Sequence, residues 1–340
     1  MSIITFILIA VIIYFSRKEL LVAWHLLSQV NLWILSLLIP LQIFSYYAVG
    51  EMVFSYLRSK KSIGHIHPWT LARLSLEMNF VNHILPSGGV SGVSYMAWRL
   101  GGYGVSAGRA TMAQVVRFTM GFVAYIALLL VALFVVTMDG NVNRWIILVS
   151  AAMILLLVVS VVGGVFLISS PTRIERFANW LTRFVNKWVR RITFGHAKNV
   201  LRRESVSKFF DDMHTDFVEL RREKKILVKP FLWGIAMTIA EISMFTVTFW
   251  ALGEQVNPAP IMIAFGVATF AGVFFVTPGG AGAYEAVMVA FITLAGVSAA
   301  VAIAGIVLTR VILLMGTIVL GYVFYQMAII KYGKRKKPRL

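Results

Sequence analysis

Two arginines lie near the middle of long apolar stretches, where a charged side chain is costly. Arg117 lies within residues 105–137 and Arg310 within residues 298–327. A guanidinium in hydrocarbon costs about 2.5–3.5 kcal/mol on insertion scales, so such residues pair with a carboxylate or face a polar cavity. The candidate carboxylates are Glu77, Glu241 and Glu285. The pattern predicts a buried site that handles a charged group, with a purely structural Arg–Glu pair between packed helices as the alternative.

Two proline–glycine motifs interrupt other apolar stretches. The first contains Pro86, Gly88 and Gly89, and the second contains Pro278, Gly279, Gly280 and Gly282. Proline and clustered glycine free backbone groups from helical bonding, which hydrocarbon tolerates only where protein or a water-filled cavity replaces the lost partners. We therefore expect both motifs inside a helical bundle, unless each is a simple tight turn. Asn82, just before the first motif, either adds a polar face to the site or caps the broken helix.

Several other chemistries are excluded or weakly supported by the residues present. The chain has no cysteine, so disulfides and thiolate sites are excluded. His65 and His67 form an isolated pair in a basic loop, which is a weak metal signal. Neither glycine motif ends in the Gly-Lys-Ser/Thr that holds nucleotide phosphates, and no Ser/His/Asp arrangement has credible spacing. We expect no metal, no cofactor and no catalytic residue, and hence a protein that is not an enzyme.

Composition places the chain in a membrane. Of its 340 residues, 59% are hydrophobic and 14% are charged, and the apolar residues are contiguous. Uncharged runs such as residues 145–168 exceed the roughly 20 residues that a helix needs to cross the hydrocarbon core. The net charge of +18 is confined to segments between the apolar runs, as the positive-inside rule describes for cytoplasmic loops. That placement argues against nucleic acid as a partner.

The apolar runs predict an all-α polytopic membrane protein with about six transmembrane helices and two re-entrant helical hairpins. The crossings are expected at residues 2–15, 32–57, 105–137, 145–168, 226–252 and 298–327. If the basic segments 58–61 and 173–229 share one side, residues 69–98 must enter and return to that side, and residues 260–297 must return to the opposite side. Glu51 is discounted, because a carboxylate near a helix end can reach water.

The two returning segments share an internal order, which suggests a duplication. Each has a proline, a proline–glycine motif and an arginine: Pro68, Pro86 and Arg117 in the first, Pro260, Pro278 and Arg310 in the second. The first interval is 18 residues in both (86 − 68 and 278 − 260), and the second is 31 (117 − 86) or 32 (310 − 278). We expect one integral membrane domain, 1–340, built as an inverted repeat of halves 1–138 and 145–330. Broken helices at matching positions are typical of a transporter's central site.

The segment 170–229 is expected to be cytoplasmic, basic and amphipathic. Trp180 and Phe184 recur at helical spacing among Arg183 and Lys187. Such a helix suits the surface of an anionic leaflet. A solvated helical hairpin between crossings is the alternative.

The motifs together resemble the lysylphosphatidylglycerol synthase transmembrane-domain family. The residues that carry the resemblance are Leu85-Pro86-Ser87-Gly88-Gly89 with Arg117, and Thr277-Pro278-Gly279-Gly280-Ala281-Gly282-Ala283-Tyr284-Glu285 with Arg310. These flippase-like domains occur alone in bacteria and archaea, or fused to a soluble aminoacyl transferase in multiple peptide resistance factors. The resemblance covers nearly the whole chain. Many relatives have a basic and an acidic residue in the first motif, where this chain has Ser87, Gly88, Gly89 and Ser91.

The resemblance implies translocation of a polar-headed phospholipid or related envelope lipid across the cytoplasmic membrane of a bacterium or archaeon, with the C-terminus in the cytoplasm. The implied partners are anionic or aminoacylated phospholipids, and a second copy or an envelope-lipid enzyme are further possibilities. With ten residues after Ile330, the transferase domain is expected to be absent. Two alternatives stay open: an ion-coupled transporter of a small solute, and a non-catalytic accessory subunit of an envelope-lipid modifying system. The residues that match the family are Pro278, Gly279, Gly280, Gly282 and Glu285, with Pro86 and Arg117.

Overall fold

The computed structural model describes residues 24–26, 28, 30–84, 90–138, 144–192, 203–274 and 282–332, and within these ranges every regular element is a helix. The helices are α3 (Leu32–Ser36), α4 (Leu38–Ser59), α5 (Pro68–Ile84), α6 (Val90–Gly101), α7 (Ala107–Met138), α8 (Arg144–Ile168), α9 (Pro171–Ile192), α10 (Arg203–Arg222), the 3-10 helix η1 (Lys224–Leu227), α11 (Val228–Ala251), α12 (Pro258–Phe274), α13 (Ala283–Leu294) and α14 (Ala299–Tyr332).

Five helical stretches are long and apolar enough to cross a membrane. They are Leu32–Ser59, Ala107–Met138, Ile147–Ile168, Lys224–Ala251 and Ala299–Ile330. The prediction of an all-α polytopic membrane protein is confirmed, and these five spans coincide with five of the six expected crossings. The sixth, residues 2–15, lies outside the described residues.

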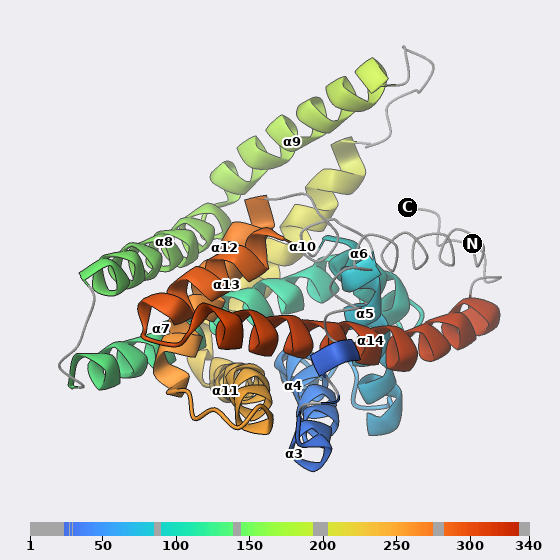
Figure 1. Ribbon diagram of the computed structural model, residues 1–340. Helices are drawn as coiled ribbons and strands as arrows, with labels where there is room; N and C mark the ends of the chain where they lie inside the picture. Colours follow the sequence, from blue (N-terminus) through green and yellow to red (C-terminus); the bar gives the residue numbers. More distant parts are fainter. Residues whose placement is uncertain are drawn as a thin grey trace.

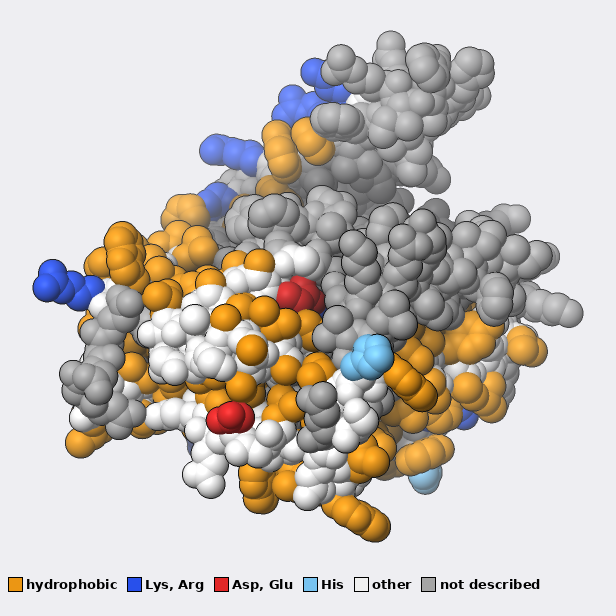
Figure 2. All heavy atoms as spheres, in the orientation of Figure 1, with side chains coloured by type: hydrophobic (Ala, Val, Ile, Leu, Met, Phe, Trp, Pro, Cys, Tyr) orange, Lys and Arg blue, Asp and Glu red, His pale blue; other side chains and the backbone are white. Residues whose placement is uncertain are grey.

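Large apolar side chains face outward along the spans, as expected for helices that contact lipid. On α8, for example, Leu148, Leu155 and Val162 are each about 60% exposed. Figure 2 shows one face of the molecule, on which hydrophobic side chains predominate and Lys and Arg side chains lie mainly over α9. Exposure of so many apolar side chains is unfavourable in water and favourable in contact with lipid hydrocarbon.

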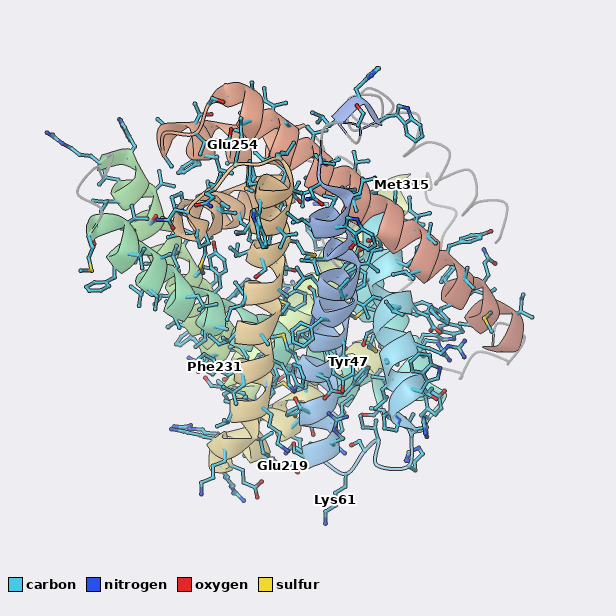
Figure 3. All side chains as sticks on the ribbon, turned by 60° about the horizontal axis from the view of Figure 1, so that its bottom comes forward. Tyr47, Lys61, Glu219, Phe231, Glu254 and Met315 are labelled. Atoms are coloured by element: carbon cyan, nitrogen blue, oxygen red, sulfur yellow. The ribbon has the colours of Figure 1, made fainter. Side chains whose placement is uncertain are left out.

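The centre of the bundle is the packing of α4 against α11, which run side by side in Figure 3. Small residues on α11 allow neighbouring helices to approach it closely, as is usual between membrane helices. A Cβ on Gly234 of α11 would lie 3.0 Å from the Cβ of Ala124 and 3.3 Å from the carbonyl oxygen of Met120, both on α7. α11 therefore contacts both α4 and α7, and the side chains on these faces of α11 lie in the middle of the protein.

Helix lengths recur in the two halves in the same order. α5 and α12 have 17 residues each, α6 and α13 have 12 each, α4 and α11 have 22 and 24, and α7 and α14 have 32 and 34. The described part of each segment predicted to return is a pair of short helices, and residues 85–89 and 275–281 between the members of each pair lie outside the described residues. This correspondence supports the duplication. The inverted orientation of the halves stays a prediction.

The two halves interlock rather than stand apart. α5 packs on α14 of the other half, and α12 packs on α7. The ring of Phe80 contacts the rings of Tyr322 and Tyr325 at centroid distances of 5.9 and 5.3 Å. In the reciprocal contact, the Tyr125 hydroxyl donates to the carbonyl oxygen of Met262 at 2.6 Å. Each broken hairpin is therefore held by the long helix of the opposite half.

The chain enters and leaves the α5–α6 hairpin at the same end of the bundle. Arg109, just after the hairpin, donates from Nη1 to Oγ of Ser62, just before it, at 3.3 Å. Figure 3 shows Lys61 and Glu219 at this end and Glu254 at the opposite end. The basic loop after α4 and the segment that contains α10 thus share one end, which agrees with the side counting from the sequence.

Candidate functional site: buried charges beside the helix breaks

Arg310 and Glu285, predicted separately, meet at the start of α13. Nη1 of Arg310 lies 2.9 Å from Oε1 of Glu285. The second carboxylate oxygen accepts from the backbone N–H of Gly282 at 2.6 Å, and Gly282 has the positive φ of +89° that glycine adopts freely. The guanidinium also lies 4.3 Å from the ring centroid of Tyr284. One carboxylate therefore joins the beginning of a broken helix to a cation on the long helix α14.

In the first hairpin, Asn82 makes the corresponding side-chain contact with a backbone N–H near a helix start. Its Oδ1 accepts from the backbone N–H of Gly92, near the start of α6, at 2.8 Å. A Cβ on Gly92 would overlap this amide. Asn82 therefore caps the second helix of the hairpin, which is the simpler of the two roles expected from the sequence. The remaining motif residues Pro86, Gly88, Gly89, Pro278, Gly279 and Gly280 lie outside the described residues.

Glu77 is buried, and its partner is one that the sequence analysis does not name. Its side chain is 1% exposed, and Oε2 accepts from Nε of Arg99 at 3.0 Å and from the Tyr95 hydroxyl at 2.8 Å. The side chain of Arg99 is only 5% exposed. A charge pair so completely removed from solvent links α5 to α6, and the structure favours a packing role for it over contact with a substrate.

Arg117 differs from its counterpart Arg310 in its surroundings. Its guanidinium carbon lies 4.1 Å from the ring centroid of Phe118, and its buried Nε has no hydrogen-bond acceptor among the described residues. Among the described residues no carboxylate forms an ion pair with it. Glu285 is the third residue of α13, and the third residue of α6, the corresponding helix of the first half, is Gly92. The first half therefore has no carboxylate at the position from which Glu285 neutralises Arg310.

Glu241 lies midway along α11. Its carboxylate acts electrostatically on the hydroxyls of Tyr46, Tyr125 and Tyr284. Within the described part of the chain, no Lys, Arg or His forms an ion pair with it. The predicted pairing of Glu241 with one of the two central arginines is therefore not seen in the described residues.

Sequence reasoning misses Glu51, which the helix correspondence identifies as the counterpart of Glu241. Each precedes by 17 residues the proline that begins the next helix (68 − 51 and 258 − 241). Contrary to the expectation of a solvated carboxylate, the side chain of Glu51 is 7% exposed and pairs with Arg58, two turns further along the same face of α4. Aligning the halves on Pro258 instead of Pro260 would have revealed the correspondence. No such signal was present for Tyr46, Tyr125 and Tyr284, because a tyrosine within an apolar run is normally interpreted as a residue of the hydrophobic core.

A polar contact at the basic end ties α10 to the bundle. Nζ of Lys60 donates to Oε2 of Glu219 at 2.7 Å, and this hydrogen bond together with the charge of Lys60 lowers the pKa of Glu219. The buried carboxylate of Asp216 accepts from Nε and Nη2 of Arg109, with Nη2 at 3.0 Å. The segment after α8 is thereby fixed to the beginning of α7. No group of three His, Asp or Glu side chains in the described ranges could hold a metal ion.

The chain matches the family described as "Lysylphosphatidylglycerol synthase TM region" over residues 2–321. The chain belongs to this family. A UPF0104 membrane protein of Methanothermobacter thermautotrophicus is 25% identical over 255 residues, which cover 73% of this chain and 70% of that relative. A second UPF0104 membrane protein of the same organism is 22% identical over 201 residues, which cover 59% of this chain and 56% of the relative. No solved structure matches the chain significantly.

The match confirms the resemblance on which the sequence analysis drew. This member of the lysylphosphatidylglycerol synthase transmembrane family is a multi-pass membrane protein with a role related to membrane lipids. Its distinguishing features are the unequal environments of Arg117 and Arg310, and the carboxyl of Glu241, with which no cation in the described part of the chain forms an ion pair.

Proposed function

We propose that the protein translocates a polar-headed phospholipid between the leaflets of the cytoplasmic membrane, with its C-terminus in the cytoplasm. The observation that carries the proposal is Arg117, a guanidinium about a third of the way along the membrane span α7 with no carboxylate partner among the described residues. An uncompensated cation at this depth is costly unless an anion reaches it. The phosphate that every glycerophospholipid carries is such an anion.

The broken hairpins support the same role. Helix starts within a membrane protein present backbone N–H groups and a partial positive charge to anionic groups of a substrate. In this chain, α13 begins beside Arg310, and the carboxylate of Glu285 occupies both the guanidinium and the Gly282 N–H. An arriving phosphate would compete with Glu285 there, whereas at Arg117 it meets no such competitor in the described part. We therefore assign the first contact with the headgroup to Arg117.

The test uses purified protein in vesicles that contain phospholipids labelled on an acyl chain, so that each headgroup stays native. The lipid series comprises phosphatidylglycerol, its lysyl ester, phosphatidylethanolamine and phosphatidylcholine, and an impermeant quencher added outside reports leaflet exchange. We expect exchange of at least one lipid to be several-fold faster than in protein-free vesicles. Arg117→Gln should abolish this acceleration, and Arg144→Gln, at the exposed start of α8, should preserve it.

Exchange no faster than in protein-free vesicles, for every lipid tested, would refute the proposal. Full activity of Arg117→Gln would refute the assignment of the first headgroup contact to this residue. Both variants should first be shown to be monodisperse in detergent with an unfolding temperature near that of the native chain. That control separates loss of transport from loss of the folded protein.

A further inference from the structure

Glu241 stands apart from the other shielded carboxylates of the protein. Among the described residues, the other shielded carboxylates each pair with an arginine: Glu51 with Arg58, Glu77 with Arg99, Asp216 with Arg109 and Glu285 with Arg310. Glu241 is half-buried midway along the membrane span of α11, as Glu285 is half-buried on α13, yet no cation in the described residues pairs with it. The difference from Glu51 is the most informative, because the two glutamates occupy matching positions in helices that pack against each other.

Three tyrosines on other helices lie near enough to Glu241 for its charge to act on their hydroxyls. Tyr46 comes from α4, where its hydroxyl contacts Nε2 of Gln42 at 2.9 Å and the hydroxyl of Thr317. Tyr125 comes from α7 and Tyr284 from α13. Of the other helices packed on α11, α3 and α12 contain no titratable residue, and η1 contributes the exposed Lys224 and Lys225 just before the start of α11. α14 contributes Arg310 through its contact with Tyr284.

A carboxyl group in this setting changes charge by exchanging a proton. Its ionised form is disfavoured by removal from water and gains nothing from a neighbouring cation. The hydroxyl of Tyr125 already donates to the carbonyl oxygen of Met262, so it does not neutralise the ionised form. The neutral form carries no such penalty. Proton exchange at this position therefore needs no partner to be displaced, in contrast to the four carboxylates that are paired with arginine.

We propose that Glu241 is the proton-binding site through which the protein couples lipid translocation to a transmembrane proton gradient. This inference rests on the proposed function. The carboxylate accepts a proton from water on one side of the membrane and releases it to the other, so that no bond other than O–H is formed or broken. The energy of the gradient would then be delivered at the centre of the bundle.

Tyr284 provides the connection between this proton and the helix break. Glu241, Arg310 and Glu285 all act electrostatically on its hydroxyl, and the guanidinium of Arg310 stacks on its ring. Neutralising Glu241 removes one negative charge from the group that also holds Arg310 and Glu285. The balance between Arg310 and an incoming phosphate then shifts with the proton occupancy of Glu241.

The first experiment imposes a pH difference across the vesicles described above and compares leaflet exchange with and without it. We expect the native protein to change its rate several-fold with the gradient, and Glu241→Gln to move lipid at a rate that ignores it. Glu254→Gln, in the exposed loop at the end of the bundle, should respond as the native protein does. Lipid movement by the native protein that is indifferent to the gradient would overturn the inference and leave the proposed function standing. Failure to move any lipid would instead count against the proposed function.

A second measurement does not depend on transport. Dicyclohexylcarbodiimide modifies protonated carboxyls in hydrocarbon, and peptide mass spectrometry locates the adduct. We expect Glu241 to be modified and its labelling to fall as pH rises, whereas Glu77, held by Arg99, should stay unmodified. Absence of labelling at Glu241 throughout the pH range, under conditions where the reagent reaches other membrane carboxyls, would overturn the inference.

Discussion

Removing the charge of Glu77 should destabilise the protein more than removing any exposed carboxylate. The Glu77 side chain is 1% exposed and that of Arg99 is 5% exposed, so Glu77→Gln leaves a guanidinium shielded from water without its counter-ion. Breaking a buried pair in this way costs about 3–5 kcal/mol. At about 2 °C per kcal/mol for a chain of this size, the midpoint of thermal unfolding in detergent should fall by roughly 6–10 °C.

The double variant Glu77→Gln/Arg99→Met provides the decisive comparison. Methionine, like arginine, has an unbranched aliphatic stem, and it carries no charge, so the double variant should regain most of the lost stability. Glu254→Gln serves as the exposed control and should lie within about 0.5 kcal/mol of the native chain. A loss below about 1 kcal/mol for Glu77→Gln, or a double variant as unstable as the single one, would refute the claim that the charge pair links α5 to α6.

Three further outcomes follow from described contacts. Gly92→Ala should lower stability by about 1–3 kcal/mol in thermal unfolding, because its Cβ overlaps the asparagine amide that caps α6; Gly163→Ala, with open space around it, should be neutral or stabilising. The lowered pKa of Glu219 in the folded protein stabilises the fold at pH values above the ordinary carboxyl pKa, and this stabilisation is lost as pH falls through the folded pKa. The unfolding midpoint of Glu219→Gln should therefore depend less on pH in the acid range. A pH profile identical to that of the native chain would contradict this. A polarity-sensitive dye on Phe184→Cys should shift to the blue in anionic vesicles, while the same dye on Glu175→Cys, across the helix, should not; equal shifts would argue for a solvated hairpin.

The absence of cysteine makes the labelling experiment direct, because each introduced thiol is unique. The expected contrast arises from the exposed aromatic side of α9. Trp180 and Phe184 are 52% and 46% exposed and stack at a centroid distance of 5.3 Å, beside the exposed Arg183 and Lys187. α9 also begins at Pro171, shortly after the membrane span of α8 ends at Ile168, and Figure 1 shows it extending away from the main body. These features favour an interfacial position for α9.

The helices were largely predictable because lipid imposes a simple rule on sequence. A crossing needs a long apolar run, and prolines mark helix starts such as Pro68, so the five described spans agree with the sequence within a few residues. That Arg310 would have a carboxylate partner was also predictable, since a charge in hydrocarbon demands a counter-ion or a polar cavity. Which carboxylate serves which arginine was not, because it depends on how helices cross.

Glu77 illustrates this limit. Its partner Arg99 lies 22 residues away on another helix, beyond a break whose geometry no periodicity specifies. The sequence analysis therefore grouped Glu77 with the two central arginines, whereas the structure places it against the end of α6. The side chains around Glu241 were missed for a related reason, since three tyrosines on separate helices converge only after folding.

The exchange of contacts between the halves has a consequence for movement. Because α5 lies on α14 and α12 lies on α7, a displacement of either broken hairpin displaces a long helix encoded in the other half of the gene. The parts of the protein that move together therefore include helices from both of the predicted repeat halves. Expressed separately, residues 1–138 and 145–330 would each lack the surface on which their own hairpin rests, and we expect stable protein only when both are made together.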